Sequence, residues 1–197
     1  MSGESQRAMS DPGEEAVVVG EGGVSDRRDR AMMPAAARRF EWWLALAVVG
    51  LDQAAKAAVR AMLPLHASVT VIPHLLDLTH VRNTGAAFGI LNAADFPLKP
   101  VVIAGVAAAA LVAVGLYAAS LGTHQLAART GLALIIGGAA GNLIDRVASG
   151  SVVDFVDVYW RTHHFWAFNV ADAAITIGVS VMILDMLIAR RHGSKAT

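Results

Sequence analysis

The sequence of 197 residues contains no cysteine, has charged side chains at only 16% of its positions and has a formal net charge of zero. The absence of cysteine excludes disulfide bonds, thiol nucleophiles and zinc sites built on thiolates. Balanced charge gives no overall basic excess of the kind that holds nucleic acid, so no nucleic-acid partner is expected. Any electrostatic function must therefore depend on where the few charges lie.

Apolar residues are abundant: they make up 55% of the chain, and the mean hydropathy is +0.52. This composition is too apolar for an ordinary soluble domain. Four segments have the length and apolar character of membrane-spanning helices, at about 42–62, 100–122, 130–147 and 168–189. The predicted fold class is a mainly α membrane protein with four transmembrane helices.

Basic residues gather at both ends of the chain, with six arginines before the first span and three Lys or Arg residues after the fourth. Positive charge favours the cytoplasmic side of a membrane. Four spans also return both termini to the same side. We therefore expect both termini to be cytoplasmic, with residues 1–39 as a disordered tail, 40–190 as the membrane domain and 191–197 as a C-terminal tail.

This orientation places two longer connections, 64–96 and 148–168, on the outer face. The first contains alternating β-branched residues, SVTVIPHLLDLTHV, and the turn signal NTGAAFG, which together predict a small extracytoplasmic β-sheet. The second contains an extended pattern, VVDFVDVY, followed by Trp160, Phe165 and Trp166, which are typical of the membrane interface. A functional site is therefore expected near the outer face.

Two carboxylates, Asp145 and Asp172, lie inside or at the edge of predicted spans. An ionised side chain near the centre of a spanning helix costs roughly 2.5 to 3.5 kcal/mol, which makes such residues candidates for function. Each follows an asparagine by three residues, Asn142 and Asn169 respectively. At this helical spacing each asparagine is expected to hydrogen-bond to its own aspartate.

Asp52 and Lys56 are one helical turn apart in the first span, so they predict an ion pair turned into the bundle. The pair is either purely structural or orients a site. His163 and His164 are adjacent, and adjacent side chains in an extended loop diverge. No metal site is expected from them.

The carboxylates allow more than one function. Two carboxyl groups brought together share a proton, and one can act as a base on water while the other polarises a carbonyl, as in aspartic proteases. The same cluster could instead relay protons or cations in a small membrane transporter, or only cap helices and form ion pairs. A transporter predicts polar residues on several spans, whereas the second span contains no charged residue.

Five short motifs follow one another along the membrane domain: DQAAK (52–56), RNTGAAFG (82–89), GGAAGNLIDR (137–146), VVDF (152–155) and FNVAD (168–172). In composition and order they resemble the motif blocks of lipoprotein signal peptidase, or signal peptidase II. The resemblance implies a four-span aspartic endopeptidase of the bacterial cytoplasmic membrane that needs no cofactor. Such enzymes remove the signal peptide of a prolipoprotein by cutting on the amino side of a diacylglyceryl-modified cysteine.

The resemblance implies that Asp154 and Asp172 are the catalytic pair. It also implies substrate-binding or supporting roles for Asp52, Lys56, Asn83, Asn142, Asp145, Arg146 and Asn169. Asp145 is the competing partner for Asp172, but its neighbour Arg146 suits a permanently ionised, supporting role. Asp157 and Asp185 are expected to be structural.

The expected partners are diacylglyceryl-modified prolipoproteins and membrane lipid, and the enzyme is expected to be a monomer. Asn83 and the NTGAAFG turn are expected to hold the substrate or the loops around it. The Ala and Gly faces of the second and third spans are expected to leave a gap beside the site for acyl chains. The lipid would then act mainly by positioning the scissile bond.

Overall fold

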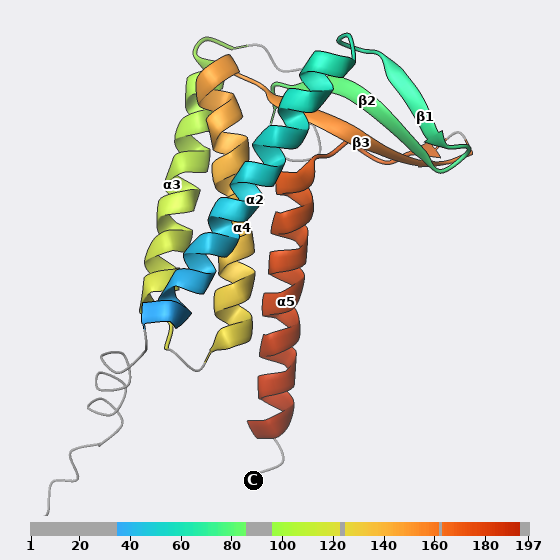
Figure 1. Cartoon of the computed structure of the whole chain (residues 1–197). Coiled ribbons are helices and arrows are strands. Elements are labelled where there is room, and N and C mark those ends of the chain that lie inside the picture. The colour runs from blue at the N-terminus through green and yellow to red at the C-terminus, as the bar shows by residue number, and fades with distance from the viewer. Residues whose placement is uncertain (1–34, 86–95, 123–124, 162, 194–197) are drawn as a thin grey trace, which may run out of the picture. The chain divides into compact units, whose positions relative to one another are not determined.

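Four long helices and four strands make up the part of the chain that the computed structural model describes, residues 35–85, 96–122, 125–161 and 163–193 (Figure 1). The helices are α2 (Ala35–Met62), α3 (Lys99–Ser120), α4 (Leu126–Ser149) and α5 (Val170–Gly193). The strands are β1 (Ser68–Ile72), β2 (Leu76–Asn83), β3 (Val152–Trp160) and β4 (His163–His164).

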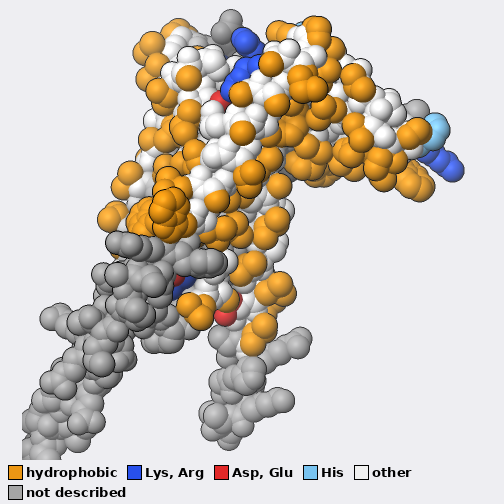
Figure 2. All heavy atoms as spheres, viewed as in Figure 1, with side chains coloured by type: hydrophobic (Ala, Val, Ile, Leu, Met, Phe, Trp, Pro, Cys, Tyr) orange, Lys and Arg blue, Asp and Glu red, His pale blue; other side chains and the backbone are white. Residues whose placement is uncertain are grey.

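Each helix contains a segment long and apolar enough to cross a membrane: Glu41–Met62, Lys99–Ser120, Leu126–Ser149 and Val170–Ile188. These segments confirm the four predicted spans, with ends that differ by a few residues. Figure 2 shows hydrophobic side chains spread over the outside of the described helices. In water such a surface would be costly, whereas lipid tails solvate it.

The start of α2 differs from the predicted limit of the N-terminal tail. The tail was expected to extend to residue 39, but the helix begins at Ala35. Residues 1–34, which form the rest of the expected tail, lie outside the described residues.

The central helix is α4, which contacts α2, α3 and α5. Its glycines allow the close approach of two neighbours. A Cβ atom at Gly137 would lie 2.7 Å from the carbonyl oxygen of Ala45 on α2, and one at Gly138 would collide with the carbonyl oxygen of Ala171 on α5. The predicted small-residue face of this span is therefore its packing face.

The strands form one antiparallel sheet in the order β1, β2, β3, β4. The expected sheet in 64–96 is confirmed by β1 and β2, while residues 86–95, with most of the NTGAAFG turn, lie outside the described residues. β3 pairs with β2 in a register that sets Val81 opposite Asp154. Val153 and Phe155 of β3 are buried with Val59, which fixes the sheet to the end of α2.

Candidate active site

The turn before α5 fixes Asp172 at the first turn of that helix. The backbone N–H of Asp172 donates to Asn169 Oδ1 at 3.0 Å, and the backbone N–H of Asn169 donates to Asp172 Oδ2 at 3.3 Å. This reciprocal arrangement is a capping box, in which two otherwise unpaired N–H groups are satisfied by side chains three residues apart. The positive end of the α5 dipole therefore faces the Asp172 carboxylate.

Asp154 comes from β3 and is only 3% exposed. Its Oδ1 accepts a hydrogen bond from Asn169 Nδ2 at 2.7 Å, and its Oδ2 accepts one from Asn83 Nδ2 at 3.2 Å. Asn169 thus binds both Asp154 and Asp172. Two carboxylates that are 18 positions apart in the sequence share one asparagine.

Burial and the negative charge of Asp172 raise the pKa of Asp154 to about 7. Hydrogen bonds from Asn83 and Asn169 and the positive charge of Lys56 act in the opposite direction. Since the unshifted value is 3.8, Asp154 retains its proton under conditions in which an ordinary aspartate has lost it. A carboxyl group in this state can donate a proton near neutral pH.

Asn142 on α4 contacts the opposite carboxylate from the one expected. Its Nδ2 donates to Asp172 Oδ1 at 2.8 Å, while its Oδ1 accepts from Lys56 Nζ at 3.0 Å and from Asn169 Nδ2 at 3.2 Å. The prediction that Asn142 would bond to Asp145 was wrong, because Lys56 lies against the Asn142 oxygen and turns the amide nitrogen toward α5.

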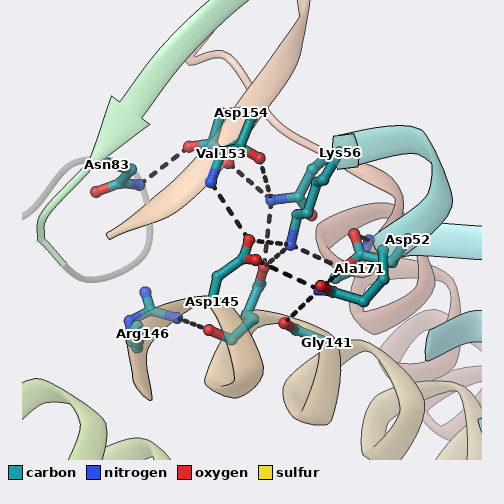
Figure 3. Close-up of polar contacts among 12 residues, drawn as sticks. Asp52, Lys56, Asn83, Gly141, Asp145, Arg146, Val153, Asp154 and Ala171 are labelled. Atoms are coloured by element: carbon teal, nitrogen blue, oxygen red, sulfur yellow. Dashed lines mark hydrogen bonds and ion pairs between the residues drawn. The ribbon is translucent and has the colours of Figure 1, made fainter. Parts of the chain in front are cut away.

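Asp52, Lys56 and Asp145 form a buried ion cluster, called here the Lys56 cluster (Figure 3). Lys56 Nζ lies 2.8 Å from Asp52 Oδ2 and 2.9 Å from Asp145 Oδ2. The exposed fractions of Asp52, Lys56 and Asp145 are 0%, 0% and 3%. The predicted inward-facing pair of Asp52 and Lys56 is confirmed, and Asp145 joins it from α4.

The cationic partners of Asp145 were not foreseen. Arg146 was expected to keep Asp145 ionised as its neighbour, but the cations that form ion pairs with Asp145 are Lys56 and Arg60, the latter 3.6 Å from Asp145 Oδ1. Asp145 Oδ2 also accepts the backbone N–H of Val153 at 3.4 Å, which ties β3 to α4. Paired with two cations, Asp145 acts as an anchor between α2, α4 and the sheet.

Arg146 instead contacts backbone oxygens. It donates to the carbonyl of Asn142 at 3.3 Å and to that of Gly85 at 3.2 Å, so it ties the segment after β2 to α4. The backbone N–H of Gly85 donates in turn to Asn83 Oδ1 at 2.9 Å, which directs Asn83 Nδ2 toward Asp154. The guanidinium of Arg146 also attracts the carboxylates of the site electrostatically.

Two contacts that support the site were not predicted from the sequence. Gln53 Nε2 donates to the Gly141 carbonyl at 3.1 Å and to Asp145 Oδ1 at 3.4 Å. Gly141 itself lies so close to Asp52 that a Cβ atom would be 2.6 Å from Asp52 Oδ2. The one available signal was position, since Gln53 follows Asp52 and Gly141 precedes Asn142.

The remaining acidic residues lie outside this cluster. Asp157 Oδ2 is 2.8 Å from His164 Nδ1, and the His164 ring stacks on Tyr159 at 4.8 Å. Asp185 follows Asp172 by about 20 Å along α5. Within the described parts of the chain, no three His, Asp or Glu side chains are arranged to hold a metal ion.

An apolar groove of about 440 Å³ lies between α3 and α4, lined by Leu111, Ala140, Leu143, Ile144, Val147 and Ala148. Ala140 and Ile144 are each two residues from Asn142, about 200° around the helix. The groove therefore opens on the face of α4 opposite to Asn142 and the candidate active site. A gap between the second and third spans is present, but it does not adjoin the site as expected.

Comparison with known proteins agrees with this arrangement. The sequence pattern described as Signal peptidase (SPase) II matches residues 44–188, which include every residue of the candidate active site described above. The chain belongs to the signal peptidase II family. The matched region covers the sheet, three spans completely and the first span from residue 44 onward, while the N-terminal 43 residues lie outside it.

Individual members of the family are similar over most of their length. The chain is 47% identical over 145 residues to the lipoprotein signal peptidase of Geobacter metallireducens, covering 74% of this chain and 88% of that protein. It is 44% identical over 142 residues to that of Geobacter sulfurreducens, covering 72% and 88%.

A solved structure has the same fold. A bacterial membrane enzyme determined by the in meso method at 1.9 Å resolution superimposes with a TM-score of 0.66 at 30% identity, covering 75% of this chain and 92% of that one. A second, determined at 2.3 Å, gives a TM-score of 0.62 at 34% identity. The four-helix arrangement with its small sheet is therefore shared with these membrane enzymes.

Proposed function

We propose that this chain is a membrane aspartic endopeptidase that removes signal peptides from prolipoproteins, with Asp154 and Asp172 as its catalytic pair. The observation that carries the proposal is Asn169, which hydrogen-bonds to both carboxylates. The raised pKa of Asp154 gives the pair one member that holds its proton near neutral pH. Relatives that are 38–47% identical are lipoprotein signal peptidases.

The contacts favour different roles for the two carboxyl groups. Asp172 lies at the positive end of α5 and accepts N–H groups from Asn142 and Asn169, which suits the ionised base. Asp154 lies on a strand, without a helix dipole, and has the raised pKa that suits the acid. Asp172 then takes a proton from water as the water oxygen attacks the scissile carbonyl, and Asp154 protonates the carbonyl oxygen.

Collapse of the resulting tetrahedral intermediate completes the cycle. The proton held by Asp172 passes to the leaving nitrogen as the C–N bond breaks, and Asp154 recovers its proton from the hydroxyl of the intermediate. Asp145 is not required in these steps, because Lys56 and Arg60 already pair with it. We therefore assign Asp145, with Asp52, to support of the site.

Membrane orientation follows from charge and aromatic residues. The basic termini favour a cytoplasmic location for both ends, which would set the sheet and the catalytic pair near the outer face of the bacterial cytoplasmic membrane. Trp160, Phe165 and Trp166 are 69%, 57% and 61% exposed, and at this level they would anchor the sheet in the headgroup layer. A prolipoprotein cysteine carrying diacylglycerol would be held at the same depth.

The decisive experiment measures cleavage of a diacylglyceryl-modified prolipoprotein by the purified full-length protein, using a gel shift. Asp154→Asn and Asp172→Asn should each abolish cleavage, because an amide cannot exchange the required proton. Asp157→Asn, on the same strand but paired with His164, is the matched control and should remain active. Cleavage should also survive a chelator.

The choice of Asp154 over Asp145 is tested in the same assay. If Asp154→Asn cleaved at the wild-type rate while Asp145→Asn did not cleave at all, Asp145 would be the partner of Asp172. Loss of cleavage on chelation would instead require a metal mechanism.

The role of the lipid needs a separate comparison. Lipidated and unlipidated precursor should be compared in one detergent at matched occupancy of the enzyme. We expect the unlipidated precursor to turn over far more slowly, because the lipid positions the scissile bond at the depth of the pair. Equal cleavage rates for the two precursors would indicate a peptidase that does not recognise the lipid.

A transporter remains the alternative from another class, and the site does not favour it. The polar side chains gather where α2, α4, α5 and β3 meet, instead of following one path across the membrane.

A further inference from the structure

Lys56 is the buried charge whose role catalysis does not explain. Its side chain is 0% exposed, so it does not reach a substrate. Its ammonium has three N–H groups, and three oxygens lie within 3.0 Å: Asp52 Oδ2 at 2.8 Å, Asp145 Oδ2 at 2.9 Å and Asn142 Oδ1 at 3.0 Å. No N–H group is left for a reacting atom. Any part that Lys56 plays in the reaction must therefore act through these partners.

The contact with Asn142 determines which way its amide faces. An ammonium donates and never accepts, so the Asn142 atom beside Lys56 must be the oxygen. The nitrogen is then directed at Asp172 Oδ1, 2.8 Å away. Asn169 Nδ2, 3.2 Å from the same oxygen, favours the same orientation. Without the lysine this oxygen would keep one donor in place of two, so the Asn142 amide would be held less firmly. Lys56 therefore reinforces the orientation in which Asn142 donates to Asp172.

The same turn of α2 also holds the backbone beside Asp172. Asp52 Oδ1 accepts the backbone N–H of Ala171 at 3.0 Å, and Asp52 Oδ2 is held by Lys56. This buried contact fixes the start of α5 against α2. Asp172 is therefore located both through its backbone and through its hydrogen-bond donor.

We propose that Lys56 is a positioning residue for catalysis, which holds Asn142 and Asp52 in the arrangement that orients Asp172 and which supplies a buried positive charge to that arrangement. This role rests on the proposed function of Asp154 and Asp172. It differs from a purely structural ion pair, because its loss should change the pH dependence of the reaction as well as its rate.

Several charged groups lie around the catalytic pair and contribute to its pH dependence. They are Asp52 and Lys56 on α2, Asp145 and Arg146 on α4, and the two carboxylates themselves, with Arg60 beside Asp145 and Lys99 of α3 on Thr84. Lys56 lowers the pKa of Asp154. If the pair is active with one proton, removing Lys56 should move both limbs of the pH profile to higher pH.

The test is Lys56→Met, which keeps most of the length of the side chain and removes its charge and donors. We expect kcat to fall about tenfold or more with KM within about twofold, and the acid limb of the kcat profile to rise by about one pH unit. Arg60→Gln is the matched control, because Arg60 also lies beside Asp145 but does not contact Asn142. It should leave the profile in place.

Asp52 and Asp145 both lose the lysine ammonium in Lys56→Met, so a second variant protects the test against misfolding. Asp52→Asn combined with Lys56→Met removes one charge of each sign, and the amide oxygen introduced on α2 can still accept the backbone N–H of Ala171. The pH profile of this double variant is compared with that of Asp52→Asn alone. The same upward shift is expected.

Other outcomes would overturn the proposal. An unmoved pH profile, with kcat reduced or not, would leave Lys56 a structural residue. If the wild type did not cleave, or Asp154→Asn did, the proposed function would fail instead. A third result would refute only the role of Lys56: the wild type cleaves, Asp154→Asn does not, and the pH profile of Lys56→Met matches that of the wild type.

Discussion

Ionisation of Asp154 should destabilise the fold. The substitution Asp154→Asn, which is expected to abolish cleavage, should therefore stabilise the folded protein at pH 8. The pKa of Asp154 rises from an ordinary 3.8 to about 7, because its carboxylate is buried beside Asp172. A difference of about 3 pKa units corresponds to roughly 4 kcal/mol between the two protonation states. Well below the ordinary value of 3.8 the group is protonated in folded and unfolded chains alike. As pH rises from 4 to 7, the folded chain binds a proton that the unfolded chain has lost, so stability falls.

The substitution Asp154→Asn removes this dependence at a small local cost. Asn83 and Asn169 both direct N–H groups at the carboxylate, whereas an amide offers one oxygen and one NH₂ group. One of the two hydrogen bonds is therefore lost, at a cost of about 2 kcal/mol. At pH 8 the variant should be more stable by roughly 2 kcal/mol, and near pH 4 it should be less stable by a similar amount.

This change in the sign of the stability difference is measured by thermal unfolding in detergent, followed by tryptophan fluorescence from pH 4 to pH 8.5. For a chain of this size we expect Asp154→Asn to unfold about 5 °C above wild type at pH 8 and below it near pH 4. Asp185→Asn removes a carboxylate outside the site and is the control. Its difference from wild type in unfolding temperature should not change sign over this pH range. A difference between Asp154→Asn and wild type that is constant over this range would refute the reasoning.

Three further predictions concern packing, the ion cluster and topology. Gly138→Leu should destabilise the fold by about 1–3 kcal/mol in thermal unfolding, because its side chain meets the α5 backbone, whereas Gly50→Leu should be neutral since nothing lies near. Asp145→Asn should lower stability by about 3 kcal/mol while cleavage per folded molecule persists; complete loss of cleavage would contradict it. Single cysteines at Ser68 and Gln125 of this cysteine-free chain should label from outside and inside respectively, and the reverse would overturn the orientation.

Features set by short-range periodicity could be predicted from the sequence. The four spans follow from the length of apolar runs, and the pairing of Asp52 with Lys56 follows from their separation by one helical turn. The turn from Asn169 to Asp172 is equally local, because a capping box needs only a three-residue spacing at a helix start. In each case the partners are neighbours on one element, so their distance is fixed before the chain packs.

Contacts between elements were decided only by the tertiary structure. Local spacing assigned Asn142 to Asp145, whereas packing placed Lys56 against the Asn142 oxygen and turned its amide to Asp172. The pairing of β3 with β2, which sets Val81 opposite Asp154 and brings Asn83 within hydrogen-bonding distance of that carboxylate, was likewise absent from the prediction. These distances depend on how closely α4 approaches its neighbours, which its glycines permit. The sequence by itself therefore determined the spans and the local pairs, and the crossing of the helices decided which carboxylates meet, because no periodicity encodes the distance between two elements.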